Sequence, residues 1–141
     1  MTVVVDASVV LKWLLEDPQH EEDTERATAL MRRIVEEEER SIQPVHWLLE
    51  VGAALTRISP DSVEDDVLML QGLSLAVDDS PEVVRRGCRL AVELGQHLFD
   101  TMYHAVALEN PDAVFVTADE RYFEKGEPLG RIVRLAEWRP A

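Results

Sequence analysis

The chain has 141 residues, a length that suits a single domain over residues 1–141 with a core large enough to fold without disulfides. Its apolar share of 46% and charged share of 30% are ordinary for a globular protein and exclude a disordered or collagen-like chain. Asp and Glu number 28 against 14 Lys and Arg, and the resulting net charge of −14 argues against long-range attraction of a polyanion.

The cysteine content and the apolar runs bear on the cellular compartment in which the protein is expected. Cys88 is the single cysteine, so no disulfide can form within the chain, and its helical pattern predicts a small buried side chain. The apolar run at 2–5 lacks the length and the basic flank of a signal peptide, and no run approaches a membrane span. We therefore expect a cytoplasmic protein without a membrane contact.

The first part of the chain alternates between short apolar runs and longer amphipathic segments. The continuously apolar run before Asp6 is typical of a buried parallel strand, and Ser8 could cap the helix that follows. We interpret the acidic run at 36–39 as a solvated helix end. Pro44 leads from a short strand into a helix. The predicted elements are strand 3–5, helices 9–16 and 24–39, strand 41–43 and helix 44–58.

The second part continues this alternation between clear start and stop signals. Ser80-Pro81 is typical of a helix start, because proline is favoured at the first helical position, and Asn110-Pro111 predicts a helix end. Strands that alternate with helices indicate an α/β fold with a central, mainly parallel sheet and helices on both faces. The predicted elements are helix 63–73, strand 75–77, helices 81–95 and 99–109, strand 113–116, a helical turn at 118–123 and an edge strand at 132–135.

Four carboxylates lie where strands are expected to meet helices. Asp6 follows the first strand and Asp119 follows the fourth. Asp100 opens a helix, and Glu50 interrupts an apolar helical run with no lysine or arginine one turn away. Ligands in open α/β sheets bind outside the carboxyl ends of the strands, so these side chains are expected to converge there.

The chemistry of this group favours a divalent cation. Carboxylates are rarely buried beside apolar segments without a partner, and a ligand set of oxygens alone suits Mg²⁺ or Mn²⁺. Such an ion would relieve the repulsion among the carboxylates, polarise a phosphate oxygen and activate a water. Each aspartate alone could instead cap a helix or stabilise a turn. Their joint occurrence predicts metal-assisted hydrolysis of phosphodiesters.

Four segments together closely resemble the PIN-domain family of metal-dependent ribonucleases, and within it the toxins of the VapC type. The family's first motif is similar to residues 4–14 (VVDASVVLKWL), and its second to residues 44–52 (PVHWLLEVG). Its third motif looks like residues 99–107 (FDTMYHAVA), and its fourth like residues 117–119 (TAD). The order and the spacing of the motifs agree over nearly the whole chain.

This resemblance implies a three-layer α/β/α PIN-like fold and endonucleolytic cleavage of RNA by a metal-bound water. It implies that Ser8 and Thr117 assist the site, and that the protein is a homodimer with a cognate antitoxin in its groove. The site would bind one or two Mg²⁺ or Mn²⁺ ions through Asp6, Glu50, Asp100 and Asp119.

Departures from the family pattern keep alternatives open. Ala53 stands where many members carry asparagine, which puts one hydrogen bond around the metal ligands in question. A PIN-like binding module without turnover, acting through RNA or a protein partner, is therefore an alternative. A phosphatase of the haloacid-dehalogenase type is disfavoured, because no second aspartate stands two residues after Asp6.

The histidines have both structural and functional interpretations. His104 lies one helical turn after Asp100 and could be a ligand or a proton donor, but we favour a partly exposed packing role. The other three show no metal-ligand spacing and are expected at surfaces or near loops; they are His20, His46 and His97.

Basic and aromatic residues beside the motifs are also open to two interpretations. Lys12, Arg121 and Lys125 could contact phosphates or be ordinary solvated charges. Trp13 and Trp47 could stack on bases, but their apolar helical patterns favour burial.

Overall fold

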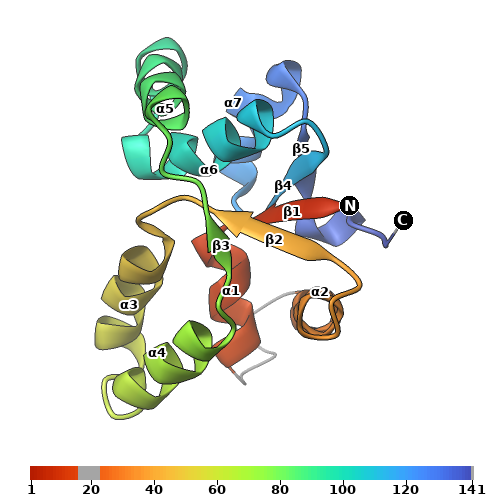
Figure 1. Ribbon diagram of the computed structural model, residues 1–141. Helices are drawn as coiled ribbons and strands as arrows, with labels where there is room; N and C mark the ends of the chain where they lie inside the picture. The colour runs from red at the N-terminus through yellow and green to blue at the C-terminus, as the bar shows by residue number, and fades with distance from the viewer. Residues whose placement is uncertain (16–22, 141) are drawn as a thin grey trace.

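A central parallel sheet forms the middle layer of the protein. The computed structural model describes residues 1–15 and 23–140, and within them five strands pair in the order β3-β2-β1-β4-β5 (Figure 1). The valines of β1 lie at the centre and are fully buried, as expected for a strand with helices on both faces. The strands are β1 (Thr2–Val5), β2 (Arg40–Gln43), β3 (Ala76–Val77), β4 (Ala113–Thr117) and β5 (Ile132–Arg134).

Helices cover both faces of the sheet and confirm the predicted three-layer α/β/α fold. The described part of the chain contains α1 (Ala7–Leu14), α2 (Thr24–Val35), α3 (Trp47–Ile58), α4 (Val63–Gly72), α5 (Pro81–Leu94), α6 (Leu98–Glu109), α7 (Glu120–Gly126) and the 3₁₀ turns η1 (Glu127–Leu129) and η2 (Leu135–Glu137). Helices α1 and α2 lie on one face, and α6 lies on the other with α5 packed on its outer side (Figure 1). Helices α3 and α4 form a hairpin that extends beside α1 (Figure 1). No helix among the described residues is long and apolar enough to span a membrane.

The strand order reverses between β1 and β4. The chain adds β2 and β3 on one side of β1, and then β4 and β5 on the other. Strands β1 and β4 pair in register up to Val5 and Val116, and the Asp6 N–H donates to the Val116 carbonyl oxygen at 3.0 Å. A reversal of this kind leaves a crevice at the carboxyl ends of the two strands, which is the usual ligand position in open α/β sheets.

A buried glutamine joins β1 to β2 at the same edge. The backbones of the two strands pair at Thr2 and Val3, with Arg40 and Ser41 as partners. Beyond them the Gln43 side chain takes over: its Oε1 accepts from the Val5 N–H at 2.7 Å, and its Nε2 donates to the Val5 carbonyl oxygen at 2.8 Å. The side-chain amide thus lies between the two backbones. It separates the end of β1, beside Asp6, from the end of β2, where the chain turns toward α3.

Some predicted helix ends lie elsewhere in the structure. Helix α1 begins at Ala7 because Asp6, not Ser8, is its N-cap, and Ser8 lies within the first turn. Helix α2 ends at Val35, before the acidic run. Glu39 was expected to be solvated but is only 4% exposed, and its carboxylate lies near the N-terminal amine, at 3.5 Å, and near Arg33. A buried glutamate is tolerated here because it has these cationic partners.

The prediction of a buried Cys88 was wrong, because the thiol side chain is exposed on α5. That helix buries Val83, Gly87 and Leu90, and Cys88 lies outside this stripe. Trp47 is buried, as expected, and Trp13 packs against the core from a partly buried position.

Candidate functional site

Asp6 is held by two hydroxyl groups that also hold the end of β4. Its Oδ2 accepts from the Ser8 Oγ at 2.8 Å and from the Thr117 Oγ1 at 2.7 Å. The Ser8 Oγ in turn accepts from the Ala118 N–H at 3.1 Å, and the Thr117 Oγ1 accepts from the Asp119 N–H at 3.0 Å. Each hydroxyl therefore links the end of β1 to the turn after β4. Both bonds go to one oxygen of Asp6, which leaves Oδ1 for another ligand.

Glu50 and Asp100 reach the same region from two helices. Glu50 lies in the first turn of α3, and its Oε1 accepts a hydrogen bond of 2.8 Å from the Tyr103 hydroxyl on α6. Asp100 lies in the first turn of α6, one turn before Tyr103. It does not cap the helix, since the N-cap is His97, whose Nδ1 accepts from the Phe99 N–H. The side chain of Asp100 therefore remains available, and the helix N-terminus favours its negative charge.

Asp119 has a structural role in the turn after β4, as the sequence left open. It is the N-cap of α7, and its Oδ1 accepts from the Tyr122 N–H at 3.0 Å. The predicted helical turn from residue 118 therefore begins two residues later, at Glu120. Capping uses one carboxylate oxygen of Asp119 and leaves the other for a further ligand.

Burial and mutual repulsion raise the pKa values of three of these carboxylates. Burial raises the pKa of Asp6 to about 7, with smaller contributions from the charges of Glu50 and Asp100, although the two hydroxyl bonds act against the shift. Burial and the charge of Asp100 raise the pKa of Glu50, and burial and the charge of Asp119 raise that of Asp100. The charges of the four residues thus act on one another as one electrostatic group.

The donor chemistry of this group fits a hard divalent cation. Within residues 1–15 and 23–140, no carboxylate of the group forms an ion pair with lysine or arginine. Its donors are oxygens alone, which suits Mg²⁺ or Mn²⁺. As placed, however, no three His, Cys, Asp or Glu side chains of the described chain form a closed ligand set. The carboxylates share one region of negative potential without yet surrounding a single point.

His104 was expected to be partly exposed, and that prediction was wrong. Its side chain is 0% exposed; its Nδ1 lies 2.9 Å from the Tyr122 hydroxyl and its Nε2 lies 2.8 Å from the Gly130 carbonyl oxygen. Burial lowers the pKa of this imidazole, so the ring is neutral, with the Nε2–H donating to Gly130 and Nδ1 accepting from Tyr122. With both nitrogens engaged, His104 is no metal ligand. It fastens α6 to α7, the helix that Asp119 caps.

His46 was expected at the surface or near a loop; it lies in the turn before α3, as its N-cap, but is buried, with 9% exposure. Its Nε2 lies 2.9 Å from the Phe99 carbonyl oxygen, and its ring stacks on that of Phe99 with centroids 4.7 Å apart. This contact joins the start of α3 to the start of α6. His97 is exposed, as predicted, and His20 lies outside the described residues.

Sequence reasoning missed two polar groups that shape the site. Gln43 was included only as the last residue of a strand, although an amide at the end of an apolar strand calls for a buried partner. Tyr103 was recognised only as part of the third motif, and no role was predicted for its hydroxyl. Its position three residues after Asp100 places both on one helical face, a spacing that could have signalled a hydroxyl near the carboxylates.

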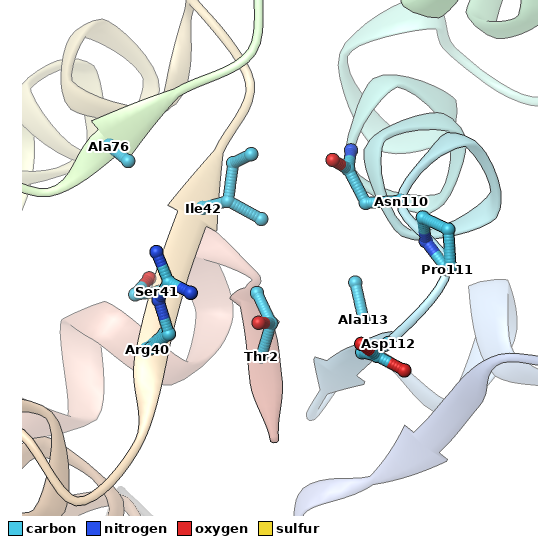
Figure 2. A pocket seen from close by; sticks show the side chains of 9 residues that line it. All are labelled: Thr2, Arg40, Ser41, Ile42, Ala76, Asn110, Pro111, Asp112 and Ala113. Carbon is cyan, nitrogen blue, oxygen red and sulfur yellow. The ribbon is translucent and has the colours of Figure 1, made fainter.

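A cavity of about 260 Å³ lies at the other end of the sheet (Figure 2). Thr2, Arg40 and Ala113, which line it, are the first residues of β1, β2 and β4. The carboxylates follow the last residues of β1 and β4. The cavity is therefore separated from them by the length of the strands and is not part of the candidate site.

Comparisons with known proteins agree with this architecture. A family model described as the PIN domain matches residues 3–127. The protein PAE2754 from Pyrobaculum aerophilum has a similar structure, with a TM-score of 0.66 and 19% identity over 96% of this chain and 90% of that one. VapBC2 from Rickettsia felis, bound to a DNA fragment from its promoter, gives a TM-score of 0.67 and 14% identity over 99% and 100%. VapBC-1 from nontypeable Haemophilus influenzae gives 0.63 and 12% over 97% and 100%. No curated protein sequence matches the chain.

Proposed function

Because the chain belongs to the PIN domain family, we propose that it is a metal-dependent endoribonuclease and the toxin component of a toxin–antitoxin pair. The observation that carries this proposal is the group of carboxylates around the buried Asp6, at the reversal of strand order. Raised pKa values without a basic partner indicate a site built to bind a cation. Two of the similar structures are VapBC proteins, which supports the toxin assignment.

In this proposal each residue of the group has a distinct role. The metal ligands are Asp6, Glu50, Asp100 and Asp119. The hydroxyls of Ser8 and Thr117 assist by fixing the carboxylate of Asp6 through one oxygen, which leaves the other for the ion. A bound Mg²⁺ or Mn²⁺ supplies Lewis acidity toward the phosphodiester and lowers the pKa of the attacking water.

The acidic surface requires a local source of attraction for RNA. The net charge of −14 opposes binding of a polyanion at long range. Arg121 and Lys125 lie exposed on α7, the helix that begins next to Asp119. We propose that these two cations contact the phosphates that flank the cleaved bond.

Substitution of Asp100 by asparagine tests the proposed function, because asparagine keeps the size of the side chain but removes its charge. Metal-dependent RNA cleavage should fall at least about 100-fold, the upper end of what is lost when an outer partner of a metal ligand is removed. The matched control is Asp112→Asn, at an exposed position in the turn before β4. Cleavage should be measured with Mn²⁺ and with a chelator. Undiminished cleavage by Asp100→Asn would show that the role assignment is wrong.

We also propose a homodimer and a bound antitoxin in the cytoplasm, with large apolar side chains of the helices as contact residues. Leu49 on α3, Leu68 on α4 and Val92 on α5 are 79%, 67% and 84% exposed. Helices α3 and α4 pack on each other, and exposed apolar side chains on adjoining helices are typical of protein contact surfaces. Light scattering of the purified protein tests the dimer, and coexpression with a small partner encoded next to it tests the antitoxin.

A binding module without turnover is the second candidate, and Ala53 is the observation that favours it. This residue lies exposed on α3, three residues after Glu50, so it offers no hydrogen bond to the carboxylate. The binding module would bind RNA or a protein partner without cleavage at any metal concentration. The same cleavage assay, repeated across metal concentrations, distinguishes the two candidates.

A further inference from the structure

Tyr103 is a buried tyrosine whose ring is fixed by packing on two sides. The side chain is 0% exposed. Its ring stacks on Phe115 of β4, with centroids 5.7 Å apart and planes at 10°, and its centroid lies 5.0 Å from that of the His46 ring in a T-shaped arrangement. The ring therefore has one position, set by the sheet below it and by the start of α3 beside it.

The hydroxyl of this fixed ring ends on a carboxylate of the candidate metal site. It donates to the Glu50 Oε1 at 2.8 Å. A phenol hydroxyl carries its proton at neutral pH and a carboxylate oxygen accepts, so the hydroxyl donates, and a bond to a charged acceptor is among the stronger kinds.

The bond connects two helices that carry separate carboxylates. Glu50 belongs to α3, while Tyr103 and Asp100 belong to α6, one helical turn apart. A second contact links the starts of the same two helices through a side chain, since the His46 Nε2 lies 2.9 Å from the Phe99 carbonyl oxygen. The distance between the two helix starts is thus fixed by His46, and the position of the Glu50 carboxylate by Tyr103.

We propose that Tyr103 is a positioning residue for Glu50, which holds that carboxylate beside Asp100 and so raises the affinity of the site for a divalent cation. This inference rests on the proposed function above. Glu50 has a long side chain with several rotamers, and the charge of Asp100 repels it in the metal-free protein. With the Tyr103 bond, the protein orders this side chain on folding, so metal binding need not do so.

The substitution Tyr103→Phe removes the hydroxyl and keeps the packed ring. Titration calorimetry with Mn²⁺ on the full chain should show binding weakened about 10-fold, as is usual when an outer partner of a metal ligand is lost. The matched control is Tyr122→Phe, a buried tyrosine on α7 whose hydroxyl bonds to His104 instead of a carboxylate. The control should bind Mn²⁺ with nearly the affinity of the original protein.

A second pair of variants tests whether Tyr103 acts through Glu50. In a Glu50→Gln background, Tyr103→Phe should weaken Mn²⁺ binding by much less than in the original chain, because the charged acceptor has been removed. A merely structural role would give the same loss in both backgrounds, and this result would overturn the inference.

The remaining outcomes separate the inference from the proposed function. If the original protein binds Mn²⁺ and Asp100→Asn weakens that binding, while Tyr103→Phe does not, only the role of Tyr103 is refuted. If Tyr122→Phe weakens binding as much as Tyr103→Phe does, the loss is a general effect of a missing buried hydroxyl, and the inference is likewise refuted. If the original protein shows no saturable binding, the proposed metal site fails, and the role of Tyr103 fails with it.

Discussion

The carboxyl group of Asp6 should make the metal-free protein less stable at neutral pH than at mildly acidic pH. Its pKa lies at about 7 in the folded chain, against 3.8 for an aspartate in its ordinary state. A carboxyl with a higher pKa in the folded state holds its proton more tightly when folded, so stability falls as the pH rises from the unfolded to the folded value. The substitution Asp6→Asn removes this titration and keeps an oxygen that can accept from both hydroxyls.

The size of the effect follows from the two pKa values. The full shift corresponds to about 4 kcal/mol of unfolding free energy, since each pKa unit is worth about 1.4 kcal/mol. Much of this pH dependence falls between about pH 5 and about pH 8. Over this range the unfolding free energy of the original protein should fall by about 3 kcal/mol relative to that of Asp6→Asn. Asp6 is only 7% exposed, so solvent screening should not remove the effect.

Urea unfolding in the presence of a chelator measures this difference. The comparison between the two proteins at each pH cancels the contributions of the histidines and of the carboxylates outside the group around Asp6. Asp61→Asn, at an exposed position between α3 and α4, is the control and should follow the original protein. If Asp6→Asn and the original protein lose the same free energy between the two pH values, Asp6 is not a buried carboxyl with a raised pKa.

Two further predictions concern buried polar groups that support the site. Gln43→Ala removes both bonds to the Val5 backbone, and because it leaves a buried donor, a buried acceptor and a cavity, it should lower the unfolding free energy by about 2–4 kcal/mol. A loss below about 1 kcal/mol in urea unfolding would mean that water replaces the amide at little cost. His104→Phe keeps an aromatic side chain, though a larger one, but leaves the Tyr122 hydroxyl and the Gly130 carbonyl without their partner, and should also cost about 2–4 kcal/mol. A thermal midpoint equal to that of the original protein would contradict this expectation.

Local patterns in the sequence predicted the order of the elements and the location of the candidate site. The apolar run before Asp6 predicts a central strand because only a strand with helices on both faces is apolar throughout. Helix-start and helix-stop signals act over a few residues, and for this reason the start of α5 at Ser80-Pro81 agrees with the structure. The alternation of strands and helices then requires a parallel sheet, and the ends of its strands place Asp6 and Asp119 at one edge.

The burial of individual polar side chains was decided by contacts between segments far apart in the chain. Nothing near His104 in the sequence indicates that Gly130 and Tyr122 surround it, and nothing near His46 indicates Phe99. Cys88 has a helical pattern on both sides, and its exposure depends on which stripe of α5 faces α6.

The sequence by itself therefore determined the fold class and the places of the four carboxylates relative to the strands and helices, because hydrophobic periodicity and helix caps are local properties of the chain. Only the tertiary structure decided that one oxygen of Asp6 is bonded to two hydroxyls and that Glu50 is held by a tyrosine of another helix. The raised pKa of Asp6 was likewise decided by the tertiary structure. It arises from the loss of water around a carboxyl group, and that loss depends on every segment that packs over it.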